Sequence, residues 1–485
     1  MKVSKEEIAA HAQEQVLAEK SVRAASRNTE LIFLILASVL VAAGLYLVFS
    51  AKTRNLGEVQ KATLNLNELT GPQQLVPLLG IIPSSAEQYF IANRIYNLKR
   101  RGEQFSNVGA IAKLRVTETE LAHTRGLPGF SKRLATAREH AKATRRELSI
   151  PLLTPTELAA LKPHLRVRNP DSYRQRFLLW TVLFFAAFYL THLVWRIRGF
   201  AGDNLILSLI HALSGIGLIL MISLRDPLRD TLMFADFTTG VLAGCLALLL
   251  FSIPDYHRQL SRLSYVPLLA ALFLAVALGL FGSGPGGSDA KINLFFFQPV
   301  ELIRILLILF LAGYFAQNWD ALRYLKQRGG RLADASRRFN IPRLDYLLPV
   351  AAGVAVSIFF FFWLSDLGPA LVIGCLFLTM YSIARNRVLL AAAGLSIIIL
   401  SFALGYVTGF PHTVRERVEM WKSPWDNHVR GGDQLADSMW SLSTGGATGT
   451  GLGLGDAQTM PAAHTDLIIS AFGEEAGALG ILALY

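Results

Sequence analysis

Residues 31–49 read LIFLILASVLVAAGLYLVF and contain no charged side chain. A helix needs about 20 mostly apolar residues to cross the hydrocarbon core of a bilayer, so this run is long enough to span a membrane. A polar, charged stretch of residues 1–30 precedes the run, and no small-residue cleavage site follows it. This pattern predicts a membrane anchor and not a cleaved signal peptide.

Nine further apolar runs follow the first. Only 17% of the 485 residues are charged and 52% are hydrophobic, whereas about 25% of the residues of a soluble domain are charged. The sequence therefore predicts an all-α polytopic membrane protein with about ten transmembrane helices. The expected spans are residues 31–50, 177–195, 204–224, 237–253, 264–282, 296–316, 345–364, 367–384, 388–409 and 464–485. Because the last run reaches Tyr485 without a polar flank, we expect the chain to be truncated within or just after a span.

The basic residues between the spans predict the topology. If the spans alternate, four groups share one side: Arg196 and Arg198; Arg258 and Arg262; seven basic residues within 323–343; and Arg385 and Arg387. Lysine and arginine mark cytoplasmic loops, so we expect a cytoplasmic N-terminus, with residues 51–176 and 410–463 outside. The net charge of +12 then reflects these loops, and no nucleic-acid partner is expected.

This topology divides the chain into five parts. We expect a cytoplasmic segment (1–30), a first anchor (31–50), a small, mainly helical extracytoplasmic module (51–176), a second anchor (177–202) and a polytopic domain (203–485). Part of the module, including Leu64 to Asn67 and Gly80, resembles a helix-hairpin-helix unit, in which hairpin amides grip a DNA phosphate. Gly80 is followed by Ile81, Ile82 and Pro83, without the second hairpin glycine, so a structural or partner-docking role is favoured over DNA binding.

Ionisable residues inside the expected spans are costly and need a reason. Glu301 and Arg304 have the i,i+3 spacing that lets side chains pair on one helix face. Their pairing fits either a salt bridge that fixes helix packing or the polar wall of a cavity for a charged lipid headgroup. Glu474 and Glu475 lie two to three turns into the last span, so we expect at least one to face a polar cavity or to pair with a cation such as Arg304.

Several short motifs occur in a fixed order in the second half of the chain. They are QPVE at 298–301 with Arg304; DLGPALV at 366–372; Arg417-Val418 with Trp421 and PWD at 424–426; Gln434 and Ser438; the glycines from Gly445-Gly446 to GLG at 451–453; HTD at 464–466; and GEE at 473–475 with Gly477 and Gly480. Together they resemble the RodA/FtsW/SpoVE family, the shape, elongation, division and sporulation (SEDS) proteins of bacteria. The resemblance covers residues 203–485.

The resemblance implies a ten-span glycosyltransferase of the bacterial cytoplasmic membrane that polymerises lipid II into peptidoglycan strands. The family works with a class B penicillin-binding transpeptidase, and the other expected contact is membrane lipid. If the span at 204–224 matches the first family span, the last two family spans lie beyond Tyr485. The sequence departs from the family where Arg304 replaces a lysine and Val300 a serine. It also departs where Asn427 follows Asp426 in place of proline, and where Asp433 replaces an aromatic residue.

The chemistry of polymerisation assigns roles to these residues. A sugar hydroxyl must attack an anomeric carbon whose leaving group is a lipid diphosphate, so a general base and nearby cations are needed. Asp426 is the expected base, within about one residue of register, and Asp433 is its nearest rival. The expected substrate-binding residues are Glu301, Arg304, Arg417, Lys422, Gln434, Ser438 and Glu474. No metal site is predicted and no cofactor is assigned; a divalent cation stays open as an option, although the sequence shows no ligand cage for one.

Two other functions fit the apolar pattern. One is a transporter that moves the lipid-linked precursor across the bilayer, and the other is an inactive scaffold that recruits wall-synthesis proteins through residues 51–176. A carboxylate in the long external loop favours the enzyme, because a transporter does not require it. The sequence does not distinguish elongation, division and sporulation.

Overall fold

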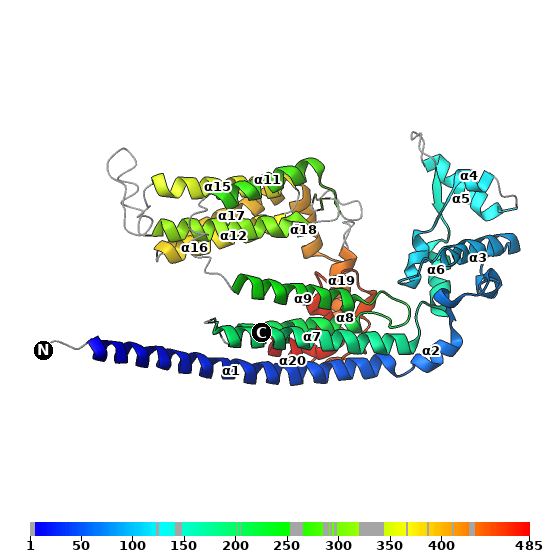
Figure 1. Cartoon of the computed structure of the whole chain (residues 1–485). Helices are drawn as coiled ribbons and strands as arrows, with labels where there is room; N and C mark the ends of the chain where they lie inside the picture. Colours follow the sequence, from blue (N-terminus) through cyan, green and yellow to red (C-terminus); the bar gives the residue numbers. More distant parts are fainter. Residues whose placement is uncertain are drawn as a thin grey trace. The chain divides into compact units, whose positions relative to one another are not determined.

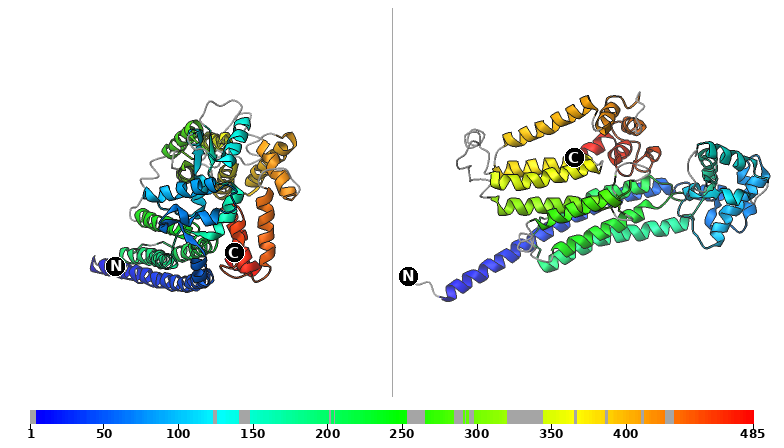
Figure 2. Two further views of the ribbon diagram at one scale, coloured as in Figure 1. Left: turned by 90° about the vertical axis from the view of Figure 1, so that its right-hand side faces the viewer. Right: turned by 90° about the horizontal axis from the view of Figure 1, so that it is seen from above.

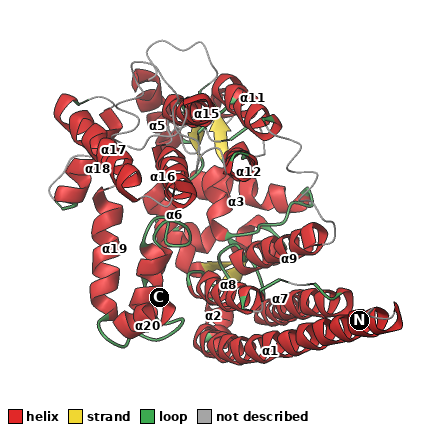
Figure 3. Ribbon diagram, turned by 90° about the vertical axis from the view of Figure 1, so that its left-hand side faces the viewer, coloured by secondary structure: helices red, strands yellow, loops and turns green. Residues whose placement is uncertain are grey.

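The computed structural model describes residues 5–485 except 123–125, 141–147, 201, 204, 253–264, 285–290, 292, 295–297, 320–343, 365–366, 386–387, 410–411 and 426–431. The chain forms two compact units, Met1–Ser252 with Ser423–Tyr485, and Ile253–Lys422. Helices dominate, and the strands of the described part form only two short pairs (Figure 3). The predicted all-α polytopic fold class is thereby confirmed.

The first unit contains four long membrane helices. α1 (Lys5–Thr53) lies along α8 (Ile206–Ser223) and α7 (Pro170–Arg198), and α7 packs on α9 (Met233–Ser252) (Figure 1). The segment Arg27–Ala62 and the other three helices are long and apolar enough to cross a membrane. Their contact faces are apolar, as expected where apolar side chains have to bury one another.

A buried charged group joins α1 to α7. The Glu30 carboxylate is fully buried; the Arg27 guanidinium donates to Glu30, and the His192 ring lies 2.6 Å from it. Arg27 also lies 5.5 Å from the centre of the Trp195 ring. The carboxylate is therefore satisfied inside the helix pair, as a charge at this depth requires.

The residues between α1 and α7 form a small module (Figure 2). The module has its own apolar core. Its elements are α2 (Leu56–Ala62), β1 (Leu64–Asn65), η1 (Leu66–Glu68), η2 (Pro72–Gln74), η3 (Val76–Leu79), α3 (Ser85–Arg100), η4 (Val108–Lys113), β2 (Arg115–Thr117), α4 (Glu118–Ala122), α5 (Pro128–His140), β3 (Ser149–Pro151), α6 (Pro155–Leu161), η5 (Lys162–His164) and β4 (Leu165–Arg166). β1 pairs with β4 in parallel, and β2 pairs with β3 in antiparallel orientation. Because Leu64 lies opposite Leu165, the two ends of the module meet.

The module is bonded to the loop between α8 and α9. The Val108 amide donates to the Arg229 carbonyl at 2.8 Å, and the Arg229 guanidinium donates to the Leu165 carbonyl at 3.2 Å. In return, the Arg168 guanidinium donates to the Asp230 carbonyl at 2.5 Å. These bonds satisfy backbone groups of a loop that has no helix or sheet partners of its own.

The described residues of the second unit form six helices. They are α11 (Val266–Phe281), α12 (Pro299–Gln317), α15 (Leu344–Trp363), α16 (Leu367–Arg385), α17 (Val388–Thr408) and α18 (His412–Lys422). α11, α12, α15 and α16 share one apolar core, and α18 packs on α17. α12 begins at Pro299, where the missing N–H of proline costs no hydrogen bond.

The C-terminal segment returns to the first unit as α19 (Gly432–Gly445), η7 (Ala457–Thr459) and α20 (Ile468–Leu484), and α19 packs on α20. α20 also contacts α8. Each of the ten predicted apolar runs thus contains a helix among its described residues. Of these helices, α12 and the four segments of the first unit have the length and hydropathy of a span.

Candidate functional site

The helix α20 is interrupted in its middle. Gly477 has φ 69° and ψ −175°, which leaves the helical region, and the left-handed φ favours glycine. The interruption frees backbone carbonyls that a continuous helix would bond internally. Inside a membrane such carbonyls must find other donors.

The glycine-rich loop between α19 and η7 supplies those donors. The Thr450 amide donates to the Glu474 carbonyl at 2.9 Å, and the Gly451 amide donates to the Glu475 carbonyl at 3.0 Å. Close approach requires glycine here: a Cβ atom at Gly449 would overlap the Glu475 carbonyl oxygen. The glycine run is therefore a close-packed partner of a broken helix, and its amides are used within the protein.

The two carboxylates at the break are buried, with 4% of Glu474 and 2% of Glu475 exposed. Glu474 accepts hydrogen bonds from the Ser441 hydroxyl and, at 2.6 Å, from the Asp456 amide. Glu475 accepts hydrogen bonds from the Ser223 hydroxyl of α8 and, at 3.1 Å, from the Gly453 amide. Hydroxyl and amide donors therefore bond both oxygens of each carboxylate. The two buried carboxylates are thus satisfied without an ion pair to Arg304.

Of the predicted site residues, Ser438 and Glu474 lie in this cluster. The Ser438 hydroxyl is 2.6 Å from the Ser470 hydroxyl, and both serines are buried between α19 and α20. Gln434 occupies the same face of α19 one turn earlier, near its N-terminus, and its side chain is exposed. The cluster thus holds the helix that presents Gln434.

Glu301 and Arg304 form the predicted pair in the first two turns of α12. One Arg304 nitrogen lies 2.8 and 2.9 Å from the two Glu301 oxygens. The Glu301 side chain is 63% exposed and that of Arg304 is 32% exposed. The i,i+3 pairing is confirmed, but the pair lies at the surface of its unit and is not a buried salt bridge.

Arg417 and Lys422 belong to α18. The Lys422 ammonium donates to the Tyr406 hydroxyl at 2.8 Å and lies 4.6 Å from the centre of that ring. Arg417 is exposed and, within the described part of the chain, has no hydrogen-bond partner. Its guanidinium is thus available to an anion. The expected base Asp426 lies outside the described residues.

Sequence reasoning missed most partners of the two carboxylates. Ser223, Ser441 and the amides of Gly453 and Asp456 carry no motif by themselves. The glycine run was the one available signal, because consecutive glycines allow a loop to approach another backbone. Among the described residues, no three His, Cys, Asp or Glu side chains are grouped so that they could hold a metal ion.

The family model for FtsW, RodA and SpoVE, described as a cell cycle protein, matches residues 203–485. The peptidoglycan glycosyltransferase RodA of Mycobacterium leprae is 33% identical over 317 residues, which cover 62% of this chain and 65% of the relative. RodA of Mycobacterium tuberculosis H37Rv is 33% identical over 308 residues, covering 59% and 62%. The probable peptidoglycan glycosyltransferase FtsW of Geobacter sulfurreducens is 27% identical over 292 residues, covering 58% and 72%.

The chain thus spans 65% of the length of the first of these relatives. No solved structure matches the chain. The matched segment begins at residue 203, after α7 has ended at Arg198, so α1, the module and α7 all lie before it. With its apolar helices and these bacterial relatives, the chain is a multi-pass bacterial membrane protein.

Proposed function

Because the chain belongs to the FtsW, RodA and SpoVE family, we propose that it is a membrane glycosyltransferase that polymerises lipid II into the glycan strands of peptidoglycan. The observation that carries the proposal is the match over residues 203–485, whose relatives bear the name peptidoglycan glycosyltransferase. The hydrogen-bonded carboxylates of α20 and the exposed cation of α18 lie within the matched segment. The activity serves cell elongation, division or sporulation.

In this proposal, Asp426 and polar residues before and after it in the chain act on the substrate. Asp426 is the general base that takes the proton of the attacking sugar hydroxyl. Arg417 and Lys422 of α18, with Arg304 of α12, stabilise the negative charge that develops on the diphosphate leaving group. The exposed, unbonded guanidinium of Arg417 supports its role, because binding an anion there breaks no existing bond. Glu301 orients Arg304 through their hydrogen bonds.

The buried residues of the cluster have a different role. Glu474 and Ser438 are bonded within the protein, so we assign them to positioning α19, α20 and the glycine-rich loop. Gln434 then binds substrate from an α19 whose orientation is fixed. Glu474 and Ser438, which the sequence predicted to contact the substrate, therefore contribute to the site indirectly in this proposal.

We propose the following membrane arrangement and partners. The N-terminus is cytoplasmic, and residues 51–176 and 410–463 face outward, which puts Asp426 on the side where lipid II is polymerised. The basic loops described above support this orientation. The five-part division at residues 30, 50, 176 and 202 follows from it, and a class B penicillin-binding transpeptidase is the protein partner.

Polymerisation of purified, labelled lipid II by the full-length protein tests the proposal, with and without its cognate transpeptidase. Asp426→Asn should lower turnover by about 10²–10⁴-fold, as expected for loss of a general base, and Asp433→Asn should cost much less. The reverse order would make Asp433 the base. If neither the wild type alone nor its complex forms polymer, the protein is not a polymerase, and translocation of labelled lipid II in vesicles would support the transporter.

A further inference from the structure

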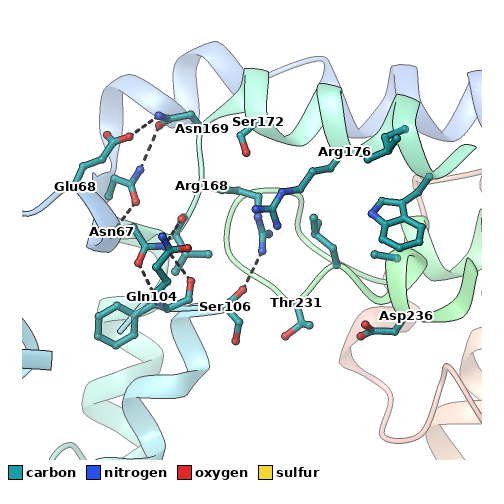
Figure 4. Close-up of a pocket in the computed structure, with 17 residues that line it drawn as sticks. Asn67, Glu68, Gln104, Ser106, Arg168, Asn169, Ser172, Arg176, Thr231 and Asp236 are labelled. Atoms are coloured by element: carbon teal, nitrogen blue, oxygen red, sulfur yellow. Dashed lines mark hydrogen bonds between the residues drawn. The ribbon is translucent and has the colours of Figure 1, made fainter. Parts of the chain in front are cut away.

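A cavity of about 680 Å³ lies where the module meets α7 and the loop before α9 (Figure 4). Three parts of the chain form its walls: the module with the residues that follow it (65–68, 104–106 and 167–169), one face of the first part of α7, and residues 231–236. All three belong to the first unit of the chain. Most of the lining lies before the family-matched segment, so the cavity is separate from the site proposed above.

The α7 wall changes from polar to apolar along the helix. Ser172, Arg176, Leu179 and Trp180 have the i, i+4, i+7, i+8 spacing of one helix face. Between Leu178 and Leu193 the large exposed side chains of α7 are apolar, as in a lipid-facing surface. Tryptophan prefers the boundary between headgroups and hydrocarbon, so Arg176 lies one turn on the headgroup side of that boundary.

The module wall is rigid and already hydrogen-bonded. The Asn67 amide group donates to the carbonyls of Phe105 at 3.0 Å and Val167 at 2.6 Å. The Asn169 amide group donates to the Glu68 carboxylate at 2.5 Å. These side chains shape the cavity, but they have little remaining capacity to bind a ligand.

Arg176 differs from these residues because its side chain is exposed and has no hydrogen bond or ion pair within the described part of the chain. It points into the same space as Arg168 (Figure 4). The Arg168 guanidinium is bonded to three carbonyls, including that of Ser106 at 2.9 Å, and not to a carboxylate. Burial, followed by the like charge of Arg176, lowers the pKa of Arg168 to about 10. Two neighbouring guanidinium groups without a shared carboxylate favour an anion between them.

We propose that this cavity binds the phosphate group of a lipid headgroup through Arg176, with the lipid chain following Leu179 and Trp180 into the membrane. A guanidinium suits this role because its planar N–H groups match two phosphate oxygens at once. The Ser172 hydroxyl, one turn away, is a second donor. The carboxylates of Asp236 and Glu68 also line the cavity and repel an anion, and Glu68 is bonded to Asn169. The phosphate is therefore held next to Arg176, away from these two carboxylates. A glycerophospholipid and a prenyl diphosphate both carry this chemistry.

The test is lipid retention by the purified full-length protein, measured by native mass spectrometry. The probes are phosphatidylglycerol, undecaprenyl diphosphate and, as a neutral control, diacylglycerol. Arg176→Gln should weaken binding of a phosphate-bearing lipid by about tenfold or more, the effect of losing charge-assisted hydrogen bonds. Arg174→Gln is the matched control: it removes the same charge from the same helix, but Arg174 pairs with Asp171 at 3.3 Å and does not line the cavity.

Selective loss in Arg176→Gln supports the proposal, and the lipid that binds more tightly to the wild type identifies the source of the phosphate. Equal loss in both glutamine variants would overturn it, since the binding would then reflect net charge. Equal retention of diacylglycerol would overturn it too. Ala235→Trp provides a second, uncharged variant, because it fills the cavity from α9 and should also displace the lipid; undiminished binding in this folded variant would contradict the site.

Discussion

Replacing Gly449 by alanine tests how the glycine-rich loop holds the broken helix. Gly446 and Gly449 both have positive φ, 53° and 81°. An added Cβ at Gly446 meets no atom within 4 Å, whereas at Gly449 it meets the backbone of Glu475. Gly446→Ala therefore measures the conformational cost alone, about 1–2 kcal/mol for a left-handed alanine.

Gly449→Ala adds a steric cost to the same conformational cost. The loop must move away from α20, which weakens the hydrogen bonds that Thr450 and Gly451 donate to the Glu474 and Glu475 carbonyls. Each bond contributes about 1 kcal/mol, so we expect a total destabilisation of about 3–4 kcal/mol. The difference between the variants corresponds to roughly 5–10 °C in melting temperature for a domain of moderate size.

Intrinsic tryptophan fluorescence during thermal unfolding of the full-length protein in detergent is a suitable assay. Trp440 lies on α19, and its ring is 5.4 Å from that of Trp425, so these two of the seven tryptophans contribute a signal from this region. Equal shifts in melting temperature for the two alanine variants would refute the reasoning, because they would show that backbone contact at Gly449 contributes nothing.

Three further predictions concern other parts of the chain. Glu301→Ala should lower the free energy of unfolding by about 1 kcal/mol or less, because its pair with Arg304 is exposed; a loss of melting temperature as large as that of Gly449→Ala would show that the pair is buried in the folded protein. Arg168→Lys should increase deuterium exchange of the loop 225–232, since a lysine ammonium lacks the planar guanidinium that bonds several carbonyls at once. Unchanged exchange would show that Arg168 does not hold this loop in place. With Cys245 and Cys375 replaced, an impermeant maleimide should label Ser106→Cys and not Ser336→Cys in intact cells, and the opposite pattern would invert the proposed topology.

The apolar helices could be predicted because length and composition alone determine whether a segment can span a membrane. The pairing of Glu301 with Arg304 could be predicted equally well, since an i,i+3 spacing depends only on local helix geometry. The spacing left two surroundings open, a salt bridge that fixes helix packing or the polar wall of a cavity, because burial depends on neighbouring helices. The pair proved to be exposed. Local sequence specifies which side chains meet on one helix, but not what covers them.

The surroundings of Glu474 and Glu475 also could not be predicted from local sequence. Their depth in an apolar run predicted that at least one of them faces a polar cavity or pairs with a cation such as Arg304. Arg304 instead pairs with Glu301, and both carboxylates have hydroxyl and amide donors. Their identity depends on contacts between distant residues, such as Ser223 with Glu475, and on the interruption at Gly477. Glycine is frequent in membrane helices, so its presence does not predict a break.

The module and the family-matched domain look independent in sequence but are continuous in the structure. The parallel pairing of β1 with β4 brings the chain back to where it entered, so α1 and α7 leave the module side by side. The loop between α8 and α9 is then within reach and is bonded to the module through Arg168 and Arg229. Ser223, which donates to Glu475, is the last residue of α8, immediately before that loop. A continuous series of hydrogen bonds and helix contacts therefore leads from the module, through the loop between α8 and α9 and through Ser223, to the broken helix α20.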